Sequence, residues 1–238
     1  MNGLTWIRYR ASAQRSLDFD TVKRGPTDRA VWARKKRRQA LLKAATRVFA
    51  KRGYRAASIS DIIQAAGAAR GTFYLYFQSK EDILFAVIDD LREQQKEFIA
   101  QISEQESGAA NANPIEQARQ GFLAWLRFYD QRRDALKILL REANLIDPRL
   151  EQKRTEVRRG VIEYLSQRIR RRQQEGVFRS EFSPEIVSHF LIGMVDEVAL
   201  SFLQKGRANL QWLAKQCASF EMNGLLKGRD EPKRKECK

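Results

Sequence analysis

The sequence predicts an all-α fold in two parts, a three-helix N-terminal head and a larger helical C-terminal body. Apolar residues recur every three to four positions over long stretches, as they do on one face of an α-helix. The 238 residues include only five prolines and thirteen glycines, so few positions interrupt a helix. No stretch alternates apolar and polar residues in the manner of a half-buried strand.

The composition is that of a globular protein, with 43% hydrophobic and 31% charged residues. We expect a flexible basic arm over 1–27, a head over 28–78, a body over 79–227 and a charged tail over 228–238. The arm either lies along nucleic-acid phosphates or is a disordered extension. The apolar periodicity predicts helices over about 28–52, 79–105, 114–130, 133–145, 149–175, 184–205 and 208–226.

Residues 58–77 predict two short helices joined by a tight turn. A serine, Ser58 or Ser60, precedes the apolar positions of the first helix and can cap it. Gly67 can then adopt the left-handed conformation that ends a helix. The second helix, expected over about 69–77, turns Phe73 and Phe77 inward. This is the pattern of a helix-turn-helix unit, whose second helix enters the DNA major groove.

The remaining side chains of the second helix are candidates for contact with DNA. Arginine can bridge two acceptors of guanine, and threonine or leucine can touch the thymine methyl group. A glycine lets the helix backbone approach the duplex closely. We therefore expect base reading by Arg70, Gly71, Thr72 and Leu75, and backbone contacts by Ser58, Tyr74 and Tyr76. Tyr74 is also open to an interpretation as a packing residue.

The positive charge is concentrated in the N-terminal third of the chain. The net charge is +16, and residues 1–80 contain 18 Lys/Arg against 4 Asp/Glu. A merely solubilising charge would be spread along the chain, whereas phosphate neutralisation requires it beside the helix-turn-helix. A run of five bases is expected beside the duplex backbone, with a solvated charged face as the alternative. The run is Arg34, Lys35, Lys36, Arg37 and Arg38.

The sequence offers little for catalysis or for a membrane. His189 is the only histidine, its neighbours are apolar, and neither Cys217 nor Cys237 has a histidine at useful spacing. We therefore expect no enzyme activity, no catalytic residue, no metal site and no cofactor. The two distant cysteines fit a reducing cytoplasmic compartment, and no apolar run is long enough to span a membrane.

The predicted helix over 184–205 is apolar on more than one side, which indicates burial on several faces. Within it, Asp196 and Glu197 interrupt the apolar run. They either recognise a cationic ligand or pair with an arginine, for example across a dimer. Aromatic residues elsewhere in the body are interpreted as plain core or as the lining of an apolar cavity.

Several positions at fixed spacing resemble the N-terminal signature of the TetR family of transcriptional regulators. The resemblance covers roughly residues 36–86, and Ala69 stands where the family usually has a serine or threonine opening the recognition helix. With alanine there, the helix lacks a side-chain cap and a phosphate contact. We therefore expect Arg70 and Thr72 to carry more of the contact with DNA. The matching residues are Asp61, Ile62, Ala66, Gly67, Gly71, Thr72, Tyr74, Phe77, Lys80, Ile83 and Leu84.

The resemblance implies a ligand-binding and dimerisation body attached to the DNA-binding head. Lys80 is then expected to contact the DNA backbone, which its unfavourable place at a positive helix end also suggests. A homodimer formed by the last two long helices would place two heads on a palindromic double-stranded operator. The expected dimer residues are Val187, Phe190, Leu191, Met194, Val195, Val198 and Leu213.

The resemblance also implies a small hydrophobic effector that binds the body and releases the DNA. The expected pocket residues are Phe122, Trp125, Phe128, Tyr129 and Phe190. Short patterns such as 139–142 and 193–196 are similar to members that respond to fatty acyl-CoA, and a multidrug-type effector is the alternative. The functional prediction is therefore a ligand-responsive repressor, with a basic protein-interaction adaptor as the alternative of another class.

Overall fold

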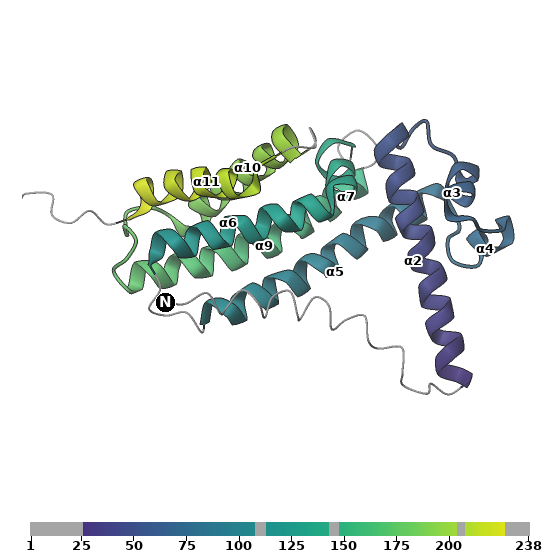
Figure 1. Ribbon diagram of the computed structural model, residues 1–238, viewed down its shortest axis with the longest axis horizontal. Coiled ribbons are helices and arrows are strands. Elements are labelled where there is room, and N and C mark those ends of the chain that lie inside the picture. Colours follow the sequence, from purple (N-terminus) through teal and green to yellow (C-terminus); the bar gives the residue numbers. More distant parts are fainter. Residues whose placement is uncertain (1–25, 108–112, 143–147, 204–207, 227–238) are drawn as a thin grey trace, which may run out of the picture.

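The computed structural model describes residues 26–107, 113–142, 148–203 and 208–226, all in helices and their connections (Figure 1). Residues 1–25 of the expected arm over 1–27 lie outside the described residues. The charged tail expected over 228–238 lies wholly outside them. An antiparallel bridge between Phe178 and Leu226 is the one extended pairing in the described parts of the chain. The all-α prediction is confirmed.

Three helices form the head, α2 (Pro26–Arg52), α3 (Ile59–Ala66) and α4 (Arg70–Tyr74). Within the head, Phe49 of α2, Ile62 of α3 and Phe73 beside Phe77 are buried together. Because α3 and α4 are too short to be stable alone, this shared burial holds them in place.

Gly67 forms the turn between α3 and α4. Its φ is +60°, a left-handed conformation that favours glycine. Its N–H donates to the carbonyl of Gln64, and the next N–H, of Ala68, donates to Ile63 at 3.1 Å. These bonds supply donors to carbonyl groups that have no partner within α3. The chain passes from α3 to α4 within three residues.

Helix α5 (Lys80–Ser107) joins the head to the body. Its buried side chains, among them Ile83, Val87 and Leu91, belong to one continuous core with both parts. The body contains α6 (Pro114–Gln131), α7 (Arg133–Lys137), a π-helix η3 (Ile138–Glu142), α9 (Pro148–Gln174), α10 (Pro184–Phe202) and α11 (Leu210–Leu225). Helix α6 packs on α11 and α10 packs on α9. The head therefore stands at one end of an elongated helical body (Figure 1).

Most element boundaries lie within two residues of the sequence expectations, and α10 ends at Phe202, three residues before its expected end. Helix α2 begins at Pro26, since proline suits the first turn of a helix. Helix α4 ends at Tyr74, three residues before the expected end, because Leu75 and Tyr76 form a turn. The helix expected over 133–145 is α7 followed by the wider π-helix, and residues 143–147 lie outside the described parts.

We predict that Phe73→Ala lowers the stability of the head by about 3–5 kcal/mol, because it removes a buried ring from a small core. The side chain of Phe73 is 0% exposed. The measurement is denaturant unfolding followed by far-UV circular dichroism. Leu75→Ala, two positions on, is the control, since Leu75 is 74% exposed and its loss should change stability by less than about 0.5 kcal/mol. Equal effects of the two substitutions would contradict the packing described here.

Candidate nucleic-acid interface and internal cavity

Burying one side of the recognition helix turns its other side outward. Because Phe73 and Phe77 lie in the core, Arg70, Gly71 and Leu75 are exposed on the surface of the head, with Thr72 half-buried beside them. A Cβ atom added at Gly71 would meet nothing within 4 Å, so the surface is open at that point. Three of the four expected base-reading residues are thus exposed, and Thr72 is half-buried.

The two tyrosines of this segment differ in environment. The ring of Tyr74 is 45% exposed, and its inner side meets Phe73 edge-on at 5.4 Å between ring centroids. The guanidinium of Arg70 lies 5.9 Å from the same ring. Tyr74 therefore packs against Phe73, is partly exposed to solvent and lies beside Arg70. Tyr76 is half-buried at the end of the segment.

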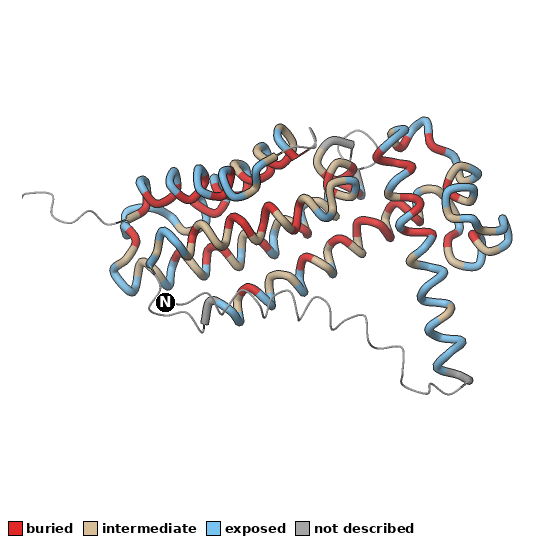
Figure 2. Tube along the Cα trace, viewed as in Figure 1, coloured by how far each residue is buried: buried red, intermediate tan, exposed pale blue. Residues whose placement is uncertain are grey.

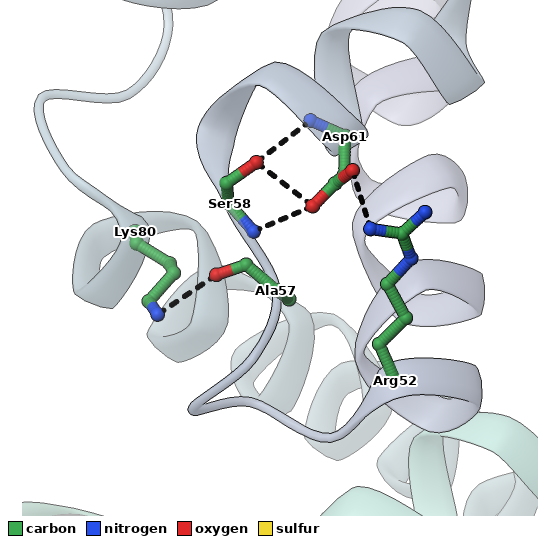
Figure 3. Close-up of polar contacts among 5 residues, drawn as sticks. All are labelled: Arg52, Ala57, Ser58, Asp61 and Lys80. Carbon is green, nitrogen blue, oxygen red and sulfur yellow. Dashed lines mark hydrogen bonds and ion pairs between the residues drawn. The ribbon is translucent and has the colours of Figure 1, made fainter.

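Ser58 caps α3 in a reciprocal arrangement with Asp61 (Figure 3). The N–H of Asp61 donates to the Ser58 hydroxyl at 3.1 Å, and the N–H of Ser58 donates to the Asp61 carboxylate at 2.9 Å. The Ser58 hydroxyl also lies 2.8 Å from that carboxylate, and Arg52 pairs with its other oxygen at 2.7 Å. Hydrogen bonds from Ser58, assisted by Arg52, hold the pKa of Asp61 below its usual value.

This arrangement changes the role expected of Ser58. A hydroxyl has one O–H to donate, and here it points to Asp61, whereas a phosphate needs a donor. Ser58 therefore serves the helix start, and the DNA-backbone contact expected of it stays a prediction. Ala69, at the start of α4, makes no side-chain cap, because its methyl group cannot accept a hydrogen bond.

Lys80 is also not directed outward as expected. Its ammonium group donates to the carbonyl oxygens of Tyr54 at 3.0 Å, Arg55 at 3.4 Å and Ala57 at 2.9 Å. Figure 3 shows the side chain reaching from the start of α5 toward Ala57. The phosphate contact expected of Lys80 therefore stays a prediction, and it would compete with these carbonyl bonds for the same donors.

The basic run lies on the part of α2 that projects from the head (Figures 1 and 2). All five of its side chains are exposed, and the first anchored position is Gln39, whose amide donates to Asp90 of α5 at 3.0 Å. Lys36 lies over the ring of Trp32 at 4.8 Å, and Arg38 over that of Phe77 at 5.4 Å. The run is therefore available to an anionic partner next to α4.

An internal cavity lies between α6, α9, α10 and α11. Its volume is about 40 Å³, so it is small. Phe122, Trp125 and Tyr129 line it, as expected. Residues of the other three helices complete the lining, and no local sequence pattern distinguishes them from other core residues. These are Val161, Tyr164, Leu165, Arg168, Leu191, Ile192, Val195 and Glu221, with Ala118 and Gly121 of α6.

Two expected pocket residues lie elsewhere. Phe128 stacks on Phe98 of α5 at 4.8 Å and lines a separate groove between α5 and α6. Phe190 is 69% exposed on the outer side of α10 and does not line the cavity. The reason is helical geometry, since Phe190 precedes the cavity residues Leu191 and Ile192 and its side chain points away from them.

Two buried carboxylates of the body lie close to arginines, Glu221 in the cavity lining and Asp196 bonded to the lining residue Tyr129. The hydroxyl of Tyr129 donates to Asp196 at 2.8 Å, and Arg158 pairs with the other Asp196 oxygen at 2.7 Å. Burial raises the pKa of Asp196, while the bond from Tyr129 and the charge of Arg158 oppose the shift. In the cavity lining, Arg168 lies 3.5 Å from Glu221. Asp196 thus pairs with an arginine of its own chain.

The expected dimer residues divide between two sides of the last helices. Val187, Leu191, Val195 and Leu213 are buried in the core of their own chain, so they are not surface residues. Met194 and Val198 are half-buried and Phe190 is exposed. The large apolar side chains that α10 and α11 expose are Ile186, Phe190, Phe202, Trp212 and Phe220.

Among the described residues, no helix is long and apolar enough to cross a membrane. The same residues contain no group of three His, Cys, Asp or Glu side chains that could hold a metal ion. What the described structure does provide is an exposed helix-turn-helix surface with a basic segment near it, and a small apolar cavity in the body.

Comparison with known proteins agrees with both parts of this structure. The family described as "Bacterial regulatory proteins, tetR family" matches residues 41–87, and "Tetracyclin repressor-like, C-terminal domain" matches residues 111–225.

Individual relatives cover most of the chain. The chain is similar to the HTH-type transcriptional repressor BepR of Brucella suis, with 30% identity over 66% of this chain and 76% of that protein. It is also similar to the fatty acid metabolism regulator protein of Bacillus subtilis, with 27% identity over 68% and 81%. The fatty acid degradation regulator FadR of Bacillus halodurans superposes with a TM-score of 0.69, at 25% identity over 85% of this chain and 98% of that one. The chain therefore belongs to the TetR family of transcriptional regulators.

Proposed function

We propose that this protein is a ligand-responsive repressor that binds a palindromic operator as a homodimer and is released by a small hydrophobic effector. It would act on DNA in the cytoplasm. The observation that carries the proposal is the outward surface of α4, which presents Arg70, Thr72 and Leu75 beside a run of five exposed bases. Phosphate attraction supplies affinity and register, and base contacts from α4 supply specificity.

Within this surface, Arg70 is the residue with the greatest capacity for base recognition. Its guanidinium can donate to two acceptors of one guanine, whereas Thr72 and Leu75 offer single contacts with a methyl group. Tyr74 lies beside Arg70 and limits where the guanidinium can move. The exposed bases Arg34–Arg38 are assigned to the phosphate backbone.

We predict that Arg70→Ala weakens operator binding by about 1–3 kcal/mol and relaxes the base preference at one position of each half-site. The operator can be selected with the wild-type protein from a pool of random duplexes, and affinity measured by fluorescence anisotropy. Lys35→Ala is the matched control. It should weaken all duplexes similarly and lower the salt dependence, because it removes a phosphate contact.

If Arg70→Ala changed neither affinity nor base preference, Arg70 would not be the reading residue. A wild-type protein that ignored duplex DNA at low ionic strength would contradict the proposed function as a whole. In that case the basic surface would suit a protein partner instead.

The outer sides of α10 and α11 support a dimer. Phe190 is 69% exposed and Phe220 is 76% exposed, and Trp212 lies on the same helix as Phe220. Exposed aromatic residues gathered on two adjacent helices are typical of a protein interface rather than of a solvated surface. A second copy with the same two helices would cover them in a four-helix arrangement around a two-fold axis.

We predict that Phe190→Asp combined with Phe220→Asp converts the dimer into a monomer, because each charge would be buried without a partner. Multi-angle light scattering after gel filtration measures the mass. Val31→Asp is the control, since Val31 is exposed on α2, far along the chain from these helices. A double variant that remained dimeric would place the interface elsewhere.

The cavity is the proposed effector site. Its lining is mainly aromatic and aliphatic, and its one carboxylate among the described lining residues, that of Glu221, pairs with Arg168 of the same chain. A neutral apolar group therefore fits the middle of the cavity better than a lipophilic cation. Two relatives at 25% identity or more are named as regulators of fatty acid metabolism or degradation. We therefore propose a fatty acyl compound, such as an acyl-CoA, as the effector.

Release requires that the body move the head. Helix α6 lines the cavity with Trp125 and Tyr129 and runs directly into α7, where Lys137 donates to the carbonyl of Ala50 at the end of α2. Arg132, between these helices, donates to Gln94 of α5 at 2.7 Å. Because the cavity is too narrow for an acyl chain as it stands, binding must spread its walls and shift these contacts. A differential affinity of a few kcal/mol is enough to switch occupancy.

We predict that palmitoyl-CoA, but not coenzyme A alone, releases the protein from its operator and changes the fluorescence of the cavity-lining Trp125. Tyr129→Ala tests the site, because it opens the cavity wall and removes the bond to Asp196, and it should alter the response without touching the head. Release by a lipophilic cation such as ethidium, with no response to palmitoyl-CoA, would favour the multidrug-type alternative.

A further inference from the structure

The ammonium group of Lys80 is hydrogen-bonded to the protein's own backbone. The three N–H groups of its ammonium meet three carbonyl oxygens, of Tyr54, Arg55 and Ala57, at 3.0, 3.4 and 2.9 Å. An ammonium group has three donors and no acceptor, so these bonds use its whole capacity. A phosphate could be bound only if these bonds were given up.

The turn between α2 and α3 supplies these carbonyls for a clear reason. Gly53, with φ of +78°, ends α2, and its N–H closes the last turn on Phe49 at 2.8 Å. The following residues run without a helix or a strand, so their carbonyl oxygens need a donor from outside. Lys80, at the first position of α5, is placed to supply it.

An aromatic ring completes the site. The ammonium of Lys80 lies 4.4 Å from the ring centroid of Tyr54, which is buried and packs against Phe49 at 5.4 Å. A cation over an aromatic face is held more strongly when it is partly withdrawn from water, and Lys80 is half-buried. The lysine is therefore tied to the core of the head as well as to the turn.

The site lies next to the start of the helix-turn-helix unit. Ala57, whose carbonyl accepts from Lys80, directly precedes Ser58, the cap of α3 (Figure 3). From there α3 leads through Gly67 into α4. We propose that Lys80 is a positioning residue, which fixes the start of α3 to the start of α5 and so sets the orientation of α4 relative to the body. This inference rests on the DNA binding proposed above.

The two roles of Lys80 predict different behaviour toward DNA. A phosphate contact adds affinity for every duplex and increases the salt dependence, because each neutralised phosphate releases counterions. A residue that orients α4 matters most where bases are read, so its loss lowers the ratio of operator affinity to affinity for unrelated DNA. It leaves the salt dependence unchanged.

The experiment compares Lys80→Met, Lys80→Arg and the exposed control Lys35→Met in the full-length protein. The selected operator and an unrelated duplex are titrated over a range of salt concentrations by fluorescence anisotropy. Lys80→Arg keeps the positive charge, but its planar fork cannot direct three donors from one nitrogen at three carbonyls. Amide hydrogen exchange of residues 54–62 is measured on each protein without DNA.

For both Lys80 variants we expect about a tenfold fall in the specificity ratio. We also expect an unchanged slope of log affinity against log salt, and faster exchange over 54–62. For Lys35→Met we expect the slope to fall by about 0.9 per protomer, with the ratio preserved. If Lys80→Met did not fold, Lys80→Arg would still decide the matter, because a phosphate contact would survive that substitution and the carbonyl contacts would not.

The proposal is overturned if Lys80→Met lowers the salt slope as Lys35→Met does and Lys80→Arg behaves as the wild type. It is also overturned if both Lys80 variants bind and exchange as the wild type does. A wild-type protein that failed to bind duplex DNA would contradict the proposed function alone, because the exchange of residues 54–62 would still report whether Lys80 holds the turn.

Discussion

The packing of α4 against the rest of the head is the constraint on which the functional surface depends. This helix has only one turn and a half, makes no side-chain cap at Ala69, and would not form alone. It exists because Phe73 and Phe77 lie in a core with Phe49 and Ile62. Arg70, Gly71 and Leu75, close in the chain to the buried ring of Phe73, are exposed. The same contacts that stabilise the head therefore select which residues can meet a duplex.

A second constraint comes from the ends of the short helices. Backbone groups at helix ends and in turns need partners, and in this head several charged side chains supply them. Asp61 serves the start of α3, Lys80 the turn before it and Lys137 the end of α2. Two of these groups, Lys80 and Lys137, come from helices outside the head. The orientation of the reading helix is thus coupled to the body through carbonyl contacts as well as through apolar packing.

Much of this could be predicted from the sequence. The helix-turn-helix, its glycine turn and the inward aromatic pair follow from local patterns, and the charge distribution indicated the nucleic-acid surface. Lys80 could not be placed in this way, because its acceptors are carbonyl groups of residues more than twenty positions away. A resemblance to a family gives a residue's usual role, and it does not show which backbone groups lie within reach in this chain.

The division of α10 could not be predicted either. Its residues are apolar on both sides, so periodicity does not tell the core side, with Leu191 and Val195, from the outer side, with Ile186 and Phe190. Four of the residues expected at the dimer interface are buried in the core of their own chain. They are Val187, Leu191, Val195 and Leu213. The cavity was predicted only in its α6 residues, since Arg168 and Glu221 come from helices whose relative placement no local pattern determines.

In the proposed dimer, two copies of the head read one duplex at a fixed separation. Hydroxyl-radical footprinting on the selected operator tests this most directly. The account predicts two protected segments, related by the two-fold axis of the sequence and centred about one helical turn apart or a multiple of it. Protection of a single segment, or of no segment at an ionic strength where the protein is folded, would contradict it.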